Sequence, residues 1–499
     1  MDVVFWNGGI KWETLSRYVG PYKISHWIKK HGYTSQVIEF VDDLDEERLY
    51  SATAKFVTQD TKVLAISTTF ISNNVYIWAS GNPGRIPESC VNVIRRIKEQ
   101  FPNVKVVLGG YMSDRVSGWG VIDATIMSYT AASEDIFLEY LDHLTKQTPP
   151  PLFSIIEPAY GGRKRRFYNQ ARTPKYNIET DDFKFVKEDV ILHNEPLPLD
   201  VSRGCIFACK FCQYPHLGKK KLDYIRGMEY IEQELIYNYE NFGTTRYYIL
   251  DDTFNDTVIK LGSFHEMVKR LPFKIQYSAY LRADLIHRFP EMAGLLQDSG
   301  LYGAYHGIET FHPSASKLVG KGWSGTHAKE FIPELYHNIW GGKVPMHTNF
   351  IIGLTGDTKD NVYSTADWFI ENKLHSIQFN VLGLYGPENN SSRYTVQSEF
   401  DKNAEKYGYK FTTAADARGH RSWKNDNWTT RSAARVCKDV TDTIKPYRKI
   451  NTWAIQSLLW YGKTHEYVET TPHIDIDWLN IKQISKELLD VYYKELMSL

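Results

Sequence analysis

Short β-rich runs and amphipathic helical stretches alternate along most of the first 390 residues of this 499-residue chain. In the first part, β-rich runs cover residues 2–7, 35–41, 62–70, 104–113 and 122–128. Helical stretches between and after them, such as 20–33, 87–101 and 134–144, complete the pattern of a doubly wound α/β sheet. Because such sheets bind ligands at the carboxyl ends of their strands, the residues of interest are Thr68, Thr69, Phe70, Gly109 and Gly110.

The alternation resumes near residue 196 and gives about six further strand–helix units. The β-rich runs are 196–202, 245–254, 274–284, 302–311, 344–354 and 376–385. Each parallel pair of strands needs a long crossover connection, so this many crossovers predicts a parallel sheet or barrel. We expect a partial (β/α)6 barrel of the TIM type, with its chemistry at the carboxyl ends of the strands.

Two other segments lack the alternation. Residues 149–197 are rich in proline, glycine and charge, which predicts a linker with room for a small hairpin. From residue 396 onward, segments rich in tryptophan and tyrosine predict a mostly helical C-terminal domain. The predicted domains are therefore a Rossmann-like sheet (1–148), the linker (149–197), the barrel (198–395) and the helical domain (396–499).

Composition limits the classes of partner. Lysine plus arginine equals aspartate plus glutamate at 59 each, so no global field draws the protein to nucleic acid or to a membrane surface. No apolar run approaches the ~18 residues that span a bilayer, and the first residues lack the features of a secretory signal. We expect a cytoplasmic protein without a membrane partner or a long nucleic-acid footprint.

Three of the five cysteines, Cys205, Cys209 and Cys212, follow the first strand of the predicted barrel. In a reducing compartment, clustered cysteines are more often metal ligands or redox groups than disulfides. Their C-x3-C-x2-C spacing lets three thiolates converge on one iron–sulfur cluster or one zinc ion. A zinc site would take His216 as its fourth ligand, and the protein would then be a non-enzymatic binding module.

With an aromatic residue, Phe211, just before the last cysteine, the motif resembles the signature of the radical S-adenosylmethionine (SAM) superfamily. The resemblance extends over about residues 195 to 390. It implies that the three cysteines bind a [4Fe-4S] cluster whose fourth iron is chelated by SAM. An electron from the cluster then cleaves SAM to methionine and a 5′-deoxyadenosyl radical, which abstracts hydrogen from a substrate. The resemblance also implies an external electron donor, such as flavodoxin or ferredoxin, and places Phe211 near the adenine.

Further residues that this resemblance assigns to SAM end the next strands in the order of the superfamily. They are Asp251, Asp252, Thr253, Arg282, Glu309 and Gly353. The acidic pair is expected at the methionyl amine, where carboxylates accept strong hydrogen bonds. The arginine is expected at the methionyl carboxylate or another anion, and the glutamate and the glycine turn at the cofactor.

Each of these residues also has an ordinary structural explanation. Asp252 is suited to cap a helix, Arg282 can pair with an aspartate, and Glu309 can pair with a barrel arginine. We single out Tyr280 and His306 as candidate donors of a proton or hydrogen atom, with a hydrogen-bonded core position as the alternative for His306.

The first domain resembles the cobalamin-binding-type domain that precedes the barrel in one large radical SAM subclass. Residues 104–113, with their glycine pair, and residues 133–144 carry this resemblance. The Asp-x-His-x-x-Gly loop that ligates cobalt in the classical motif is absent. If cobalamin binds, the resemblance implies that Thr68, Thr69, Gly109 and Gly110 line its pocket. We expect cobalamin-dependent methylation of an unactivated carbon. The alternative is a cobalamin-independent radical rearrangement, cyclisation or cleavage of a small molecule, peptide or modified nucleotide.

Overall fold

The computed structural model describes most of the chain in two compact units. The described residues are 1–8, 16–67, 86–110, 113, 116, 120–127, 132–156, 164–168, 175–212, 223–386, 397–413, 421–448 and 478–499. The first unit consists of Met1–Pro198, Gln233–Thr244 and Leu479–Leu499. The second consists of Leu199–Glu232 and Thr245–Trp478. No helix among the described residues is long and apolar enough to cross a membrane.

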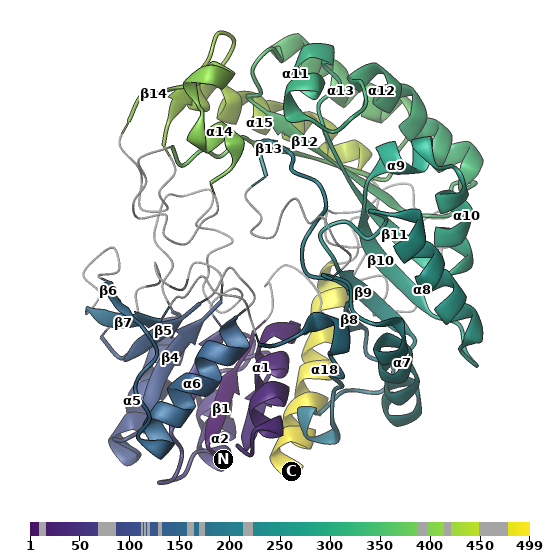
Figure 1. The fold of residues 1–499 in the computed structure, drawn as a ribbon. Coiled ribbons are helices and arrows are strands. Elements are labelled where there is room, and N and C mark those ends of the chain that lie inside the picture. Colours follow the sequence, from purple (N-terminus) through teal and green to yellow (C-terminus); the bar gives the residue numbers. More distant parts are fainter. Residues whose placement is uncertain are drawn as a thin grey trace. The chain divides into compact units, whose positions relative to one another are not determined.

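The described strands of the first unit form a seven-stranded sheet of order β2-β1-β3-β4-β5-β7-β6 (Figure 1). The strands are β1 (Val3–Trp6), β2 (Ser35–Ile38), β3 (Val63–Ser67), β4 (Lys105–Gly109), β5 (Ala124–Ile126), β6 (Ser154–Ile156) and β7 (Arg165–Tyr168). All neighbours pair in parallel except β6, which lies antiparallel to β7 at the edge. The order 2-1-3-4-5 is that of a doubly wound sheet, whose ligands bind at the switch point between β1 and β3. The predicted fold of this part is confirmed.

Among the described residues, four helices accompany this sheet along the chain. They are α1 (Val19–Lys30), α2 (Glu46–Phe56), α5 (Glu88–Gln100) and α6 (Ser133–Lys146). In three dimensions α1 contacts α6 and α2 contacts α5. The strands β1 and β2 are buried along their whole length, as expected for a parallel sheet with helices on both faces.

The predicted linker contributes directly to the sheet. Its two strands, β6 and β7, form a hairpin, and β7 pairs in parallel with β5. Two short 3₁₀ helices, η1 (Ile178–Thr180) and η2 (Lys187–Asp189), follow. The segment therefore holds the small hairpin that the sequence allowed, and this hairpin extends the doubly wound sheet.

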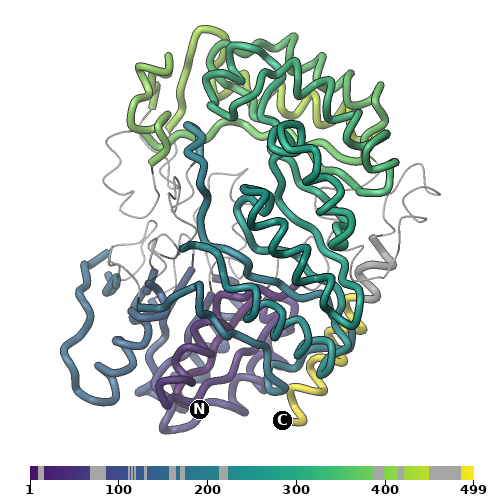
Figure 2. Tube along the Cα trace, turned by 45° about the vertical axis from the view of Figure 1, so that its right-hand side comes forward, coloured from purple at the N-terminus to yellow at the C-terminus, as the bar shows by residue number. Residues whose placement is uncertain are grey.

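The last helix, α18 (Trp478–Ser498), packs in the first unit, beside segments from the start of the chain (Figure 2). Arg48 on α2 lies 2.5 Å from Asp490 on α18. Lys55 donates a hydrogen bond to the carbonyl of Met497 at 2.6 Å. Helix α18 thus belongs to the first unit, and residues 397–448 belong to the second.

The second unit contains a six-stranded sheet in sequential order, from β8 to β13. The strands are β8 (Leu197–Asp200), β9 (Arg246–Leu250), β10 (Gln276–Leu281), β11 (Leu301–Glu309), β12 (Met346–Ile352) and β13 (Ser376–Val381). The strands from β9 to β13 pair in parallel with one another. Sequential parallel strands joined by helices are the arrangement of a partial (β/α)6 barrel, so this prediction is also confirmed.

Helices connect these strands, and small elements follow them (Figure 1). The connecting elements are α7 (Met228–Phe242), α8 (Val258–Arg270), α9 (Ala283–Arg288), α10 (Glu291–Asp298), α11 (Pro313–Val319), α12 (Gly325–Glu334), η3 (Leu335–Ile339) and α13 (Lys359–Glu371). After β13 come α14 (Glu399–Lys402), η5 (Glu405–Tyr407), β14 (Lys410–Phe411), β15 (Trp423–Lys424), α15 (Thr430–Ile444) and η6 (Lys445–Tyr447). Helix α15 contacts both α13 and β13 and so extends the outer layer of the second unit.

Candidate functional site

The cysteine loop follows β8, as predicted. Cys205 is buried, whereas Cys209 and Cys212 are partly exposed, and all three are free thiols. The sulfur of Cys205 lies 3.4 Å from the hydroxyl oxygen of Thr253. The backbone N–H of Cys212 donates to the carbonyl of Cys209 at 3.0 Å, which closes a turn within the loop. Burial raises the pKa of the Cys205 thiol, because the thiolate loses water.

The donor set of this loop fits an iron–sulfur cluster. Thiolates are the usual ligands of such clusters, and this loop carries three thiols that form no disulfide. As the side chains stand, the described part of the chain has no group of three or more His, Cys, Asp or Glu close enough to hold a metal ion. Phe211 lies beside Cys212 and is half-buried, while His216, the fourth ligand of the zinc alternative, lies outside the described residues.

The loop after β9 is built around the buried ammonium of Lys260. Its Nζ lies 2.9 Å from both Asp251 Oδ2 and Asp256 Oδ1, and the side chains of all three residues are fully buried. Lys260 also donates to the carbonyl of Thr253 at 3.0 Å, and Asp251 accepts the backbone N–H of Thr253 at 2.9 Å. Asp251 and Thr253 are thus engaged in the loop itself, and this network sets the position of the hydroxyl beside Cys205.

Asp252 differs from its neighbour. Within the described residues its carboxylate accepts no hydrogen bond and forms no ion pair. Burial, reinforced by the charge of Asp251, raises the pKa of Asp252 to about 7. Asp252 is also not the cap of α8, because that cap is Thr257, whose hydroxyl accepts the backbone N–H of Lys260 at 3.1 Å. Asp252 is therefore the carboxylate at this strand end that remains available for a ligand.

Arg282, at the end of β10, is tied to the cysteine loop. Its Nη1 lies 3.7 Å from the sulfur of Cys209, and its guanidinium carbon lies 3.9 Å from the ring centre of Phe207. The same guanidinium pairs with both carboxylate oxygens of Asp284, at 3.0 and 2.6 Å. The pairing with an aspartate that the sequence suggested as an alternative is thus present.

Glu309 ends β11 in a left-handed conformation, with φ of 72°. The pairing with β12 is irregular between Gly307 and Glu309, which marks a bulge. Lys321, rather than an arginine, pairs with Glu309 at 2.6 Å. A Cβ on Gly307 would lie 2.5 Å from Glu309 Oε1, so the glycine leaves room for the carboxylate.

Gly353 follows β12 with φ of 103°, a conformation that glycine adopts at little cost. A Cβ at this position would lie 2.2 Å from Cη2 of Trp423 on β15. Tyr409 donates a hydrogen bond to the carbonyl of Gly353 at 3.2 Å. The close approach observed at this glycine is that of the Trp423 indole, and its predicted contact with the cofactor stays a prediction.

The two candidate donors, on β10 and β11, differ in their surroundings. Tyr280 is 44% exposed, and its ring stacks on that of Tyr305 at 5.0 Å, which in turn packs edge-on against His347 at 5.7 Å. These rings cross three neighbouring strands, β10 to β12. His306 is fully buried and stacks against Trp340 at 6.1 Å. Burial lowers the pKa of His306 to about 3, so this ring is neutral, and its surroundings are those of a core residue.

Sequence reasoning assigned no role to Lys260, Lys321 or Tyr305. Lys260 lies on α8 and Lys321 lies in the loop between α11 and α12, and a lysine at either kind of position is usually solvated. For Tyr305 a signal was available in the strand register, because this residue lies directly opposite Tyr280 on β10 and His347 on β12. The two lysines gave no such signal.

The first unit carries the glycine pair predicted for cobalamin. Gly109 ends β4, and Gly110 adopts φ of 96°. Thr68 and Thr69 lie outside the described residues. The carboxyl ends of β1 and β2 carry Asn7 and Glu39, joined by a hydrogen bond of 2.9 Å from Asn7 Nδ2. Burial raises the pKa of Glu39 to about 7.

A buried ion pair lies beside these two residues. Arg17 contacts Glu195 at 2.6 Å, and both side chains are fully buried. The guanidinium also donates to Tyr22 at 2.6 Å and lies 5.2 Å from the ring centre of Phe40 and 5.4 Å from that of Tyr492. The backbone N–H of Glu39 donates to the Tyr492 hydroxyl at 2.8 Å. Helix α18 thereby covers part of this end of the sheet.

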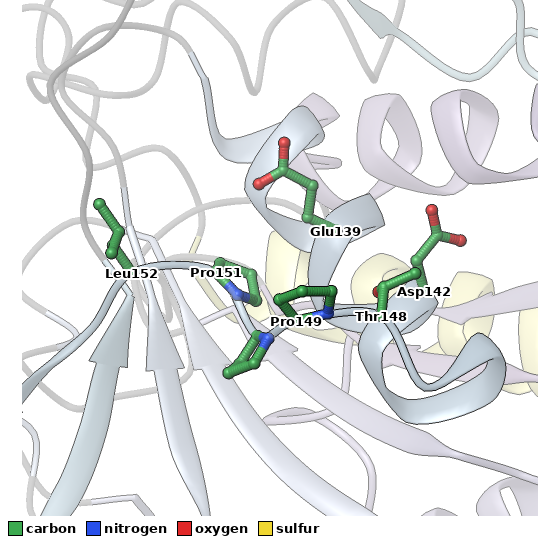
Figure 3. Close-up of a pocket in the computed structure, with 7 residues that line it drawn as sticks. Glu139, Asp142, Thr148, Pro149, Pro151 and Leu152 are labelled. Carbon is green, nitrogen blue, oxygen red and sulfur yellow. The ribbon is translucent and has the colours of Figure 1, made fainter.

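A pocket of about 410 Å³ lies at the end of α6 (Figure 3). Its lining residues are Glu139, Asp142, Thr148, Pro149, Pro150, Pro151 and Leu152. Asp142 is already paired with Lys146 at 2.6 Å. None of the predicted site residues lines this pocket, so we assign it no part in the chemistry.

Comparison with known proteins agrees with this arrangement. Residues 199–369 match the family model of the radical SAM superfamily. A bacteriochlorophyllide d C-12(1)-methyltransferase of Chlorobaculum tepidum is 22% identical over 234 residues, 46% of this chain and 49% of that protein. An uncharacterised methyltransferase of Pyrococcus horikoshii is 24% identical over 187 residues, 37% of this chain and 39% of that protein. The chain thus matches half or less of the length of these curated relatives.

Solved structures show the same fold. TsrM from Kitasatospora setae, a radical SAM methyltransferase solved with its tryptophan substrate and a SAM analogue, has a TM-score of 0.63 at 13% identity. The alignment covers 98% of this chain and all of that one. OxsB, a cobalamin-dependent SAM radical enzyme solved with aqua-cobalamin, has a TM-score of 0.55 at 12% identity over 84% of this chain and 56% of that one. Residues 199–369 of this chain thus form a domain of the radical SAM superfamily, for which a [4Fe-4S] cluster and SAM are the implied cofactors.

Proposed function

We propose that this protein is a cobalamin-dependent radical SAM enzyme that methylates an unactivated carbon of a substrate still to be identified. The observation that carries the proposal is the combination of two features in one chain. The first is a loop of three free cysteines at the start of a sequential parallel sheet. The second is a doubly wound sheet of order 2-1-3-4-5. The match to TsrM extends over both.

Cys205, Cys209 and Cys212 would hold the cluster, which supplies the electron that cleaves SAM. Asp252 is the residue of the β9 end that we assign to the methionyl amine, because Asp251 is engaged with Lys260. A carboxylate without another partner can accept the hydrogen bonds of an amine without first breaking an existing one. Glu309 and Phe211 remain assigned to the cofactor by resemblance to the family.

The proposal also includes cobalamin as a second cofactor, which carries the methyl group. The sheet order and the glycine pair at the end of β4 support it, as does the likeness to two enzymes solved with cobalamin bound. Curated relatives that are methyltransferases support methyl transfer as the reaction. A cobalt-ligating histidine of the classical motif is absent from the sequence, so we expect cobalamin bound without that ligand.

Tyr280 is the residue we assign to substrate contact. Its ring is exposed on one side and supported by Tyr305 on the other, which fixes its orientation. His347 is held by Ser376 at 2.8 Å and Asn349 at 3.2 Å, and burial lowers its pKa to about 4. A neutral, aromatic lining of this kind suits an uncharged substrate with hydrogen-bonding groups. An external flavodoxin or ferredoxin would supply the electron.

Anaerobic purification, cluster reconstitution and a reductant-driven assay test the proposal. SAM labelled with deuterium in its methyl group would be incubated with the reconstituted protein, with and without cobalamin. The assay measures 5′-deoxyadenosine, S-adenosylhomocysteine and labelled methyl transfer to candidate substrates. Cys209→Ala should lose iron and all products, whereas Cys437→Ala, a cysteine on α15 outside the loop, should keep both.

The outcomes separate the alternatives. Cobalamin uptake together with S-adenosylhomocysteine supports methyl transfer. 5′-Deoxyadenosine without cobalamin uptake would replace the proposal by a cobalamin-independent radical reaction. A colourless zinc protein without either product would leave a binding module.

A further inference from the structure

Arg282 reaches the cysteine loop, and four of the five N–H groups of its guanidinium have partners, one of them in that loop. Its Nε and one Nη2 N–H pair with Asp284, and Nη2 also donates to the carbonyl of Lys321. One Nη1 N–H points to the sulfur of Cys209 at 3.7 Å. An arginine binds a carboxylate most strongly through two parallel N–H groups, and Asp284 already occupies that fork.

The position of this guanidinium is fixed from three sides. The backbone N–H of Arg282 donates to Asn255 Oδ1 at 2.8 Å, and Asn255 Nδ2 donates back to the carbonyl of Arg282 at 3.0 Å. The guanidinium lies flat enough on Phe207 for its carbon to be 3.9 Å from the ring centre. Phe207 itself belongs to the cysteine loop, between Cys205 and Cys209. The arginine therefore contacts the loop through a sulfur and a ring while it is held by the segment after β9 and by α9.

We propose that Arg282 is a positioning residue that holds the cysteine loop and raises the reduction potential of its cluster, rather than a ligand of the SAM carboxylate. This inference rests on the proposed function, because it requires the cluster. Hydrogen bonds to the sulfurs and the local charge are among the properties that set the potential of an iron–sulfur cluster. A donor and a positive charge beside the Cys209 sulfur favour the reduced cluster, which carries one more negative charge.

The test is a redox titration of the reconstituted cluster without SAM, followed by electron paramagnetic resonance. In Arg282→Gln the donor fork and the charge are lost, so the midpoint potential should become more negative. At the midpoint potential of the wild type, we expect the ratio of reduced to oxidised clusters to be about tenfold lower in Arg282→Gln. A change of about this size corresponds to the loss of one hydrogen bond from a charged donor. Arg282→Lys keeps the charge and should fall between the two. Arg288→Gln, at an exposed arginine at the end of α9, is the matched control and should titrate like the wild type.

A second variant keeps the inference testable if Arg282→Gln does not retain its cluster. Asp284→Asn removes the carboxylate that offsets the guanidinium, so the cluster potential should shift in the opposite direction, to less negative values. A wild-type potential in Arg282→Gln, or an unchanged or more negative one in Asp284→Asn, would overturn the inference. So would a selective loss of SAM affinity in Arg282→Gln, measured by equilibrium dialysis, at an unchanged potential. Failure of the wild-type protein to take up iron would instead refute the proposed function.

Discussion

Replacing Lys260 with methionine should strongly destabilise the second unit. The substitution leaves Asp251 and Asp256 buried without the ammonium that lies 2.9 Å from each of them. Burial disfavours the ammonium, yet the two carboxylates outweigh burial and raise the pKa of Lys260. Removing one partner from a buried ion pair typically costs about 3–5 kcal/mol, because the remaining charge has neither water nor a counter-ion.

Lys269 on the same helix provides the matched control. It pairs with Glu266 at 3.4 Å, and both side chains are more than half exposed. Exposed pairs contribute about 0–1 kcal/mol, so Lys269→Met should leave stability nearly unchanged. Chemical denaturation followed by circular dichroism measures both variants. In thermal scans we expect Lys260→Met to melt roughly 6–20 °C below wild type, from about 2–4 °C per kcal/mol in a domain of this size.

The same substitution should reach the cysteine loop. Lys260 holds the carbonyl of Thr253, whose hydroxyl lies 3.4 Å from Cys205, so iron retention after reconstitution should fall in Lys260→Met and not in Lys269→Met. Adding Asp251→Asn and Asp256→Asn to Lys260→Met should recover much of the stability, because the uncompensated charges disappear. A Lys260→Met protein within about 1 kcal/mol of the Lys269→Met protein would refute the reasoning.

Three further substitutions test the structure elsewhere. The pKa of Glu39 is raised from 4.5 to about 7, so the folded state binds this proton more tightly and loses stability as pH rises through that window. Glu39→Gln should therefore become more stable relative to wild type as pH rises, by about 3 kcal/mol of unfolding free energy between pH 4.5 and 8. Urea denaturation measures this difference, and a difference that stays constant across pH would contradict the prediction. Gly353→Ala should cost at least about 2 kcal/mol in the same assay, from strain at φ of 103° and the clash with Trp423, and a neutral result would show that the indole moves freely. Arg17→Met should lower the free energy of unfolding by about 3–5 kcal/mol, because it leaves the buried Glu195 without its partner. The double variant Arg17→Met with Glu195→Leu should lose clearly less, and equal losses would argue against a buried ion pair.

The fold could be predicted from sequence because its signal is local. Alternating β-rich and helical stretches specify strands and crossovers one after another, and the parallel pairing follows from the crossover lengths. The edge hairpin was harder to predict. Its strand β7 consists of Arg165–Tyr168, and charged residues obscure the pattern. Arg165 is nevertheless buried, and it donates to the hydroxyl of Thr125 on β5 at 2.7 Å.

The candidate site was predictable in its positions but not in its pairings. Strand order placed Asp251 and Asp252 at one strand end, yet only the packing of α8 shows that Lys260 engages one of them and not the other. Likewise, the glycine at 353 was evident as a turn, while its contact with Trp423 joins residues 70 positions apart. Such pairings depend on the packing of distant segments, which neither periodicity nor spacing encodes.

The contact between Tyr492 and Glu39 has a consequence for the order in which the protein is made. The two residues are 453 positions apart, so at ordinary rates of synthesis the ribosome needs roughly 20–90 s to deliver the second after the first. During that interval Phe40 lacks the aromatic partner that packs on it at 5.1 Å in the finished molecule. The first unit to emerge is therefore among the last to be completed, and a chain interrupted before α18 would leave that apolar surface open to chaperones.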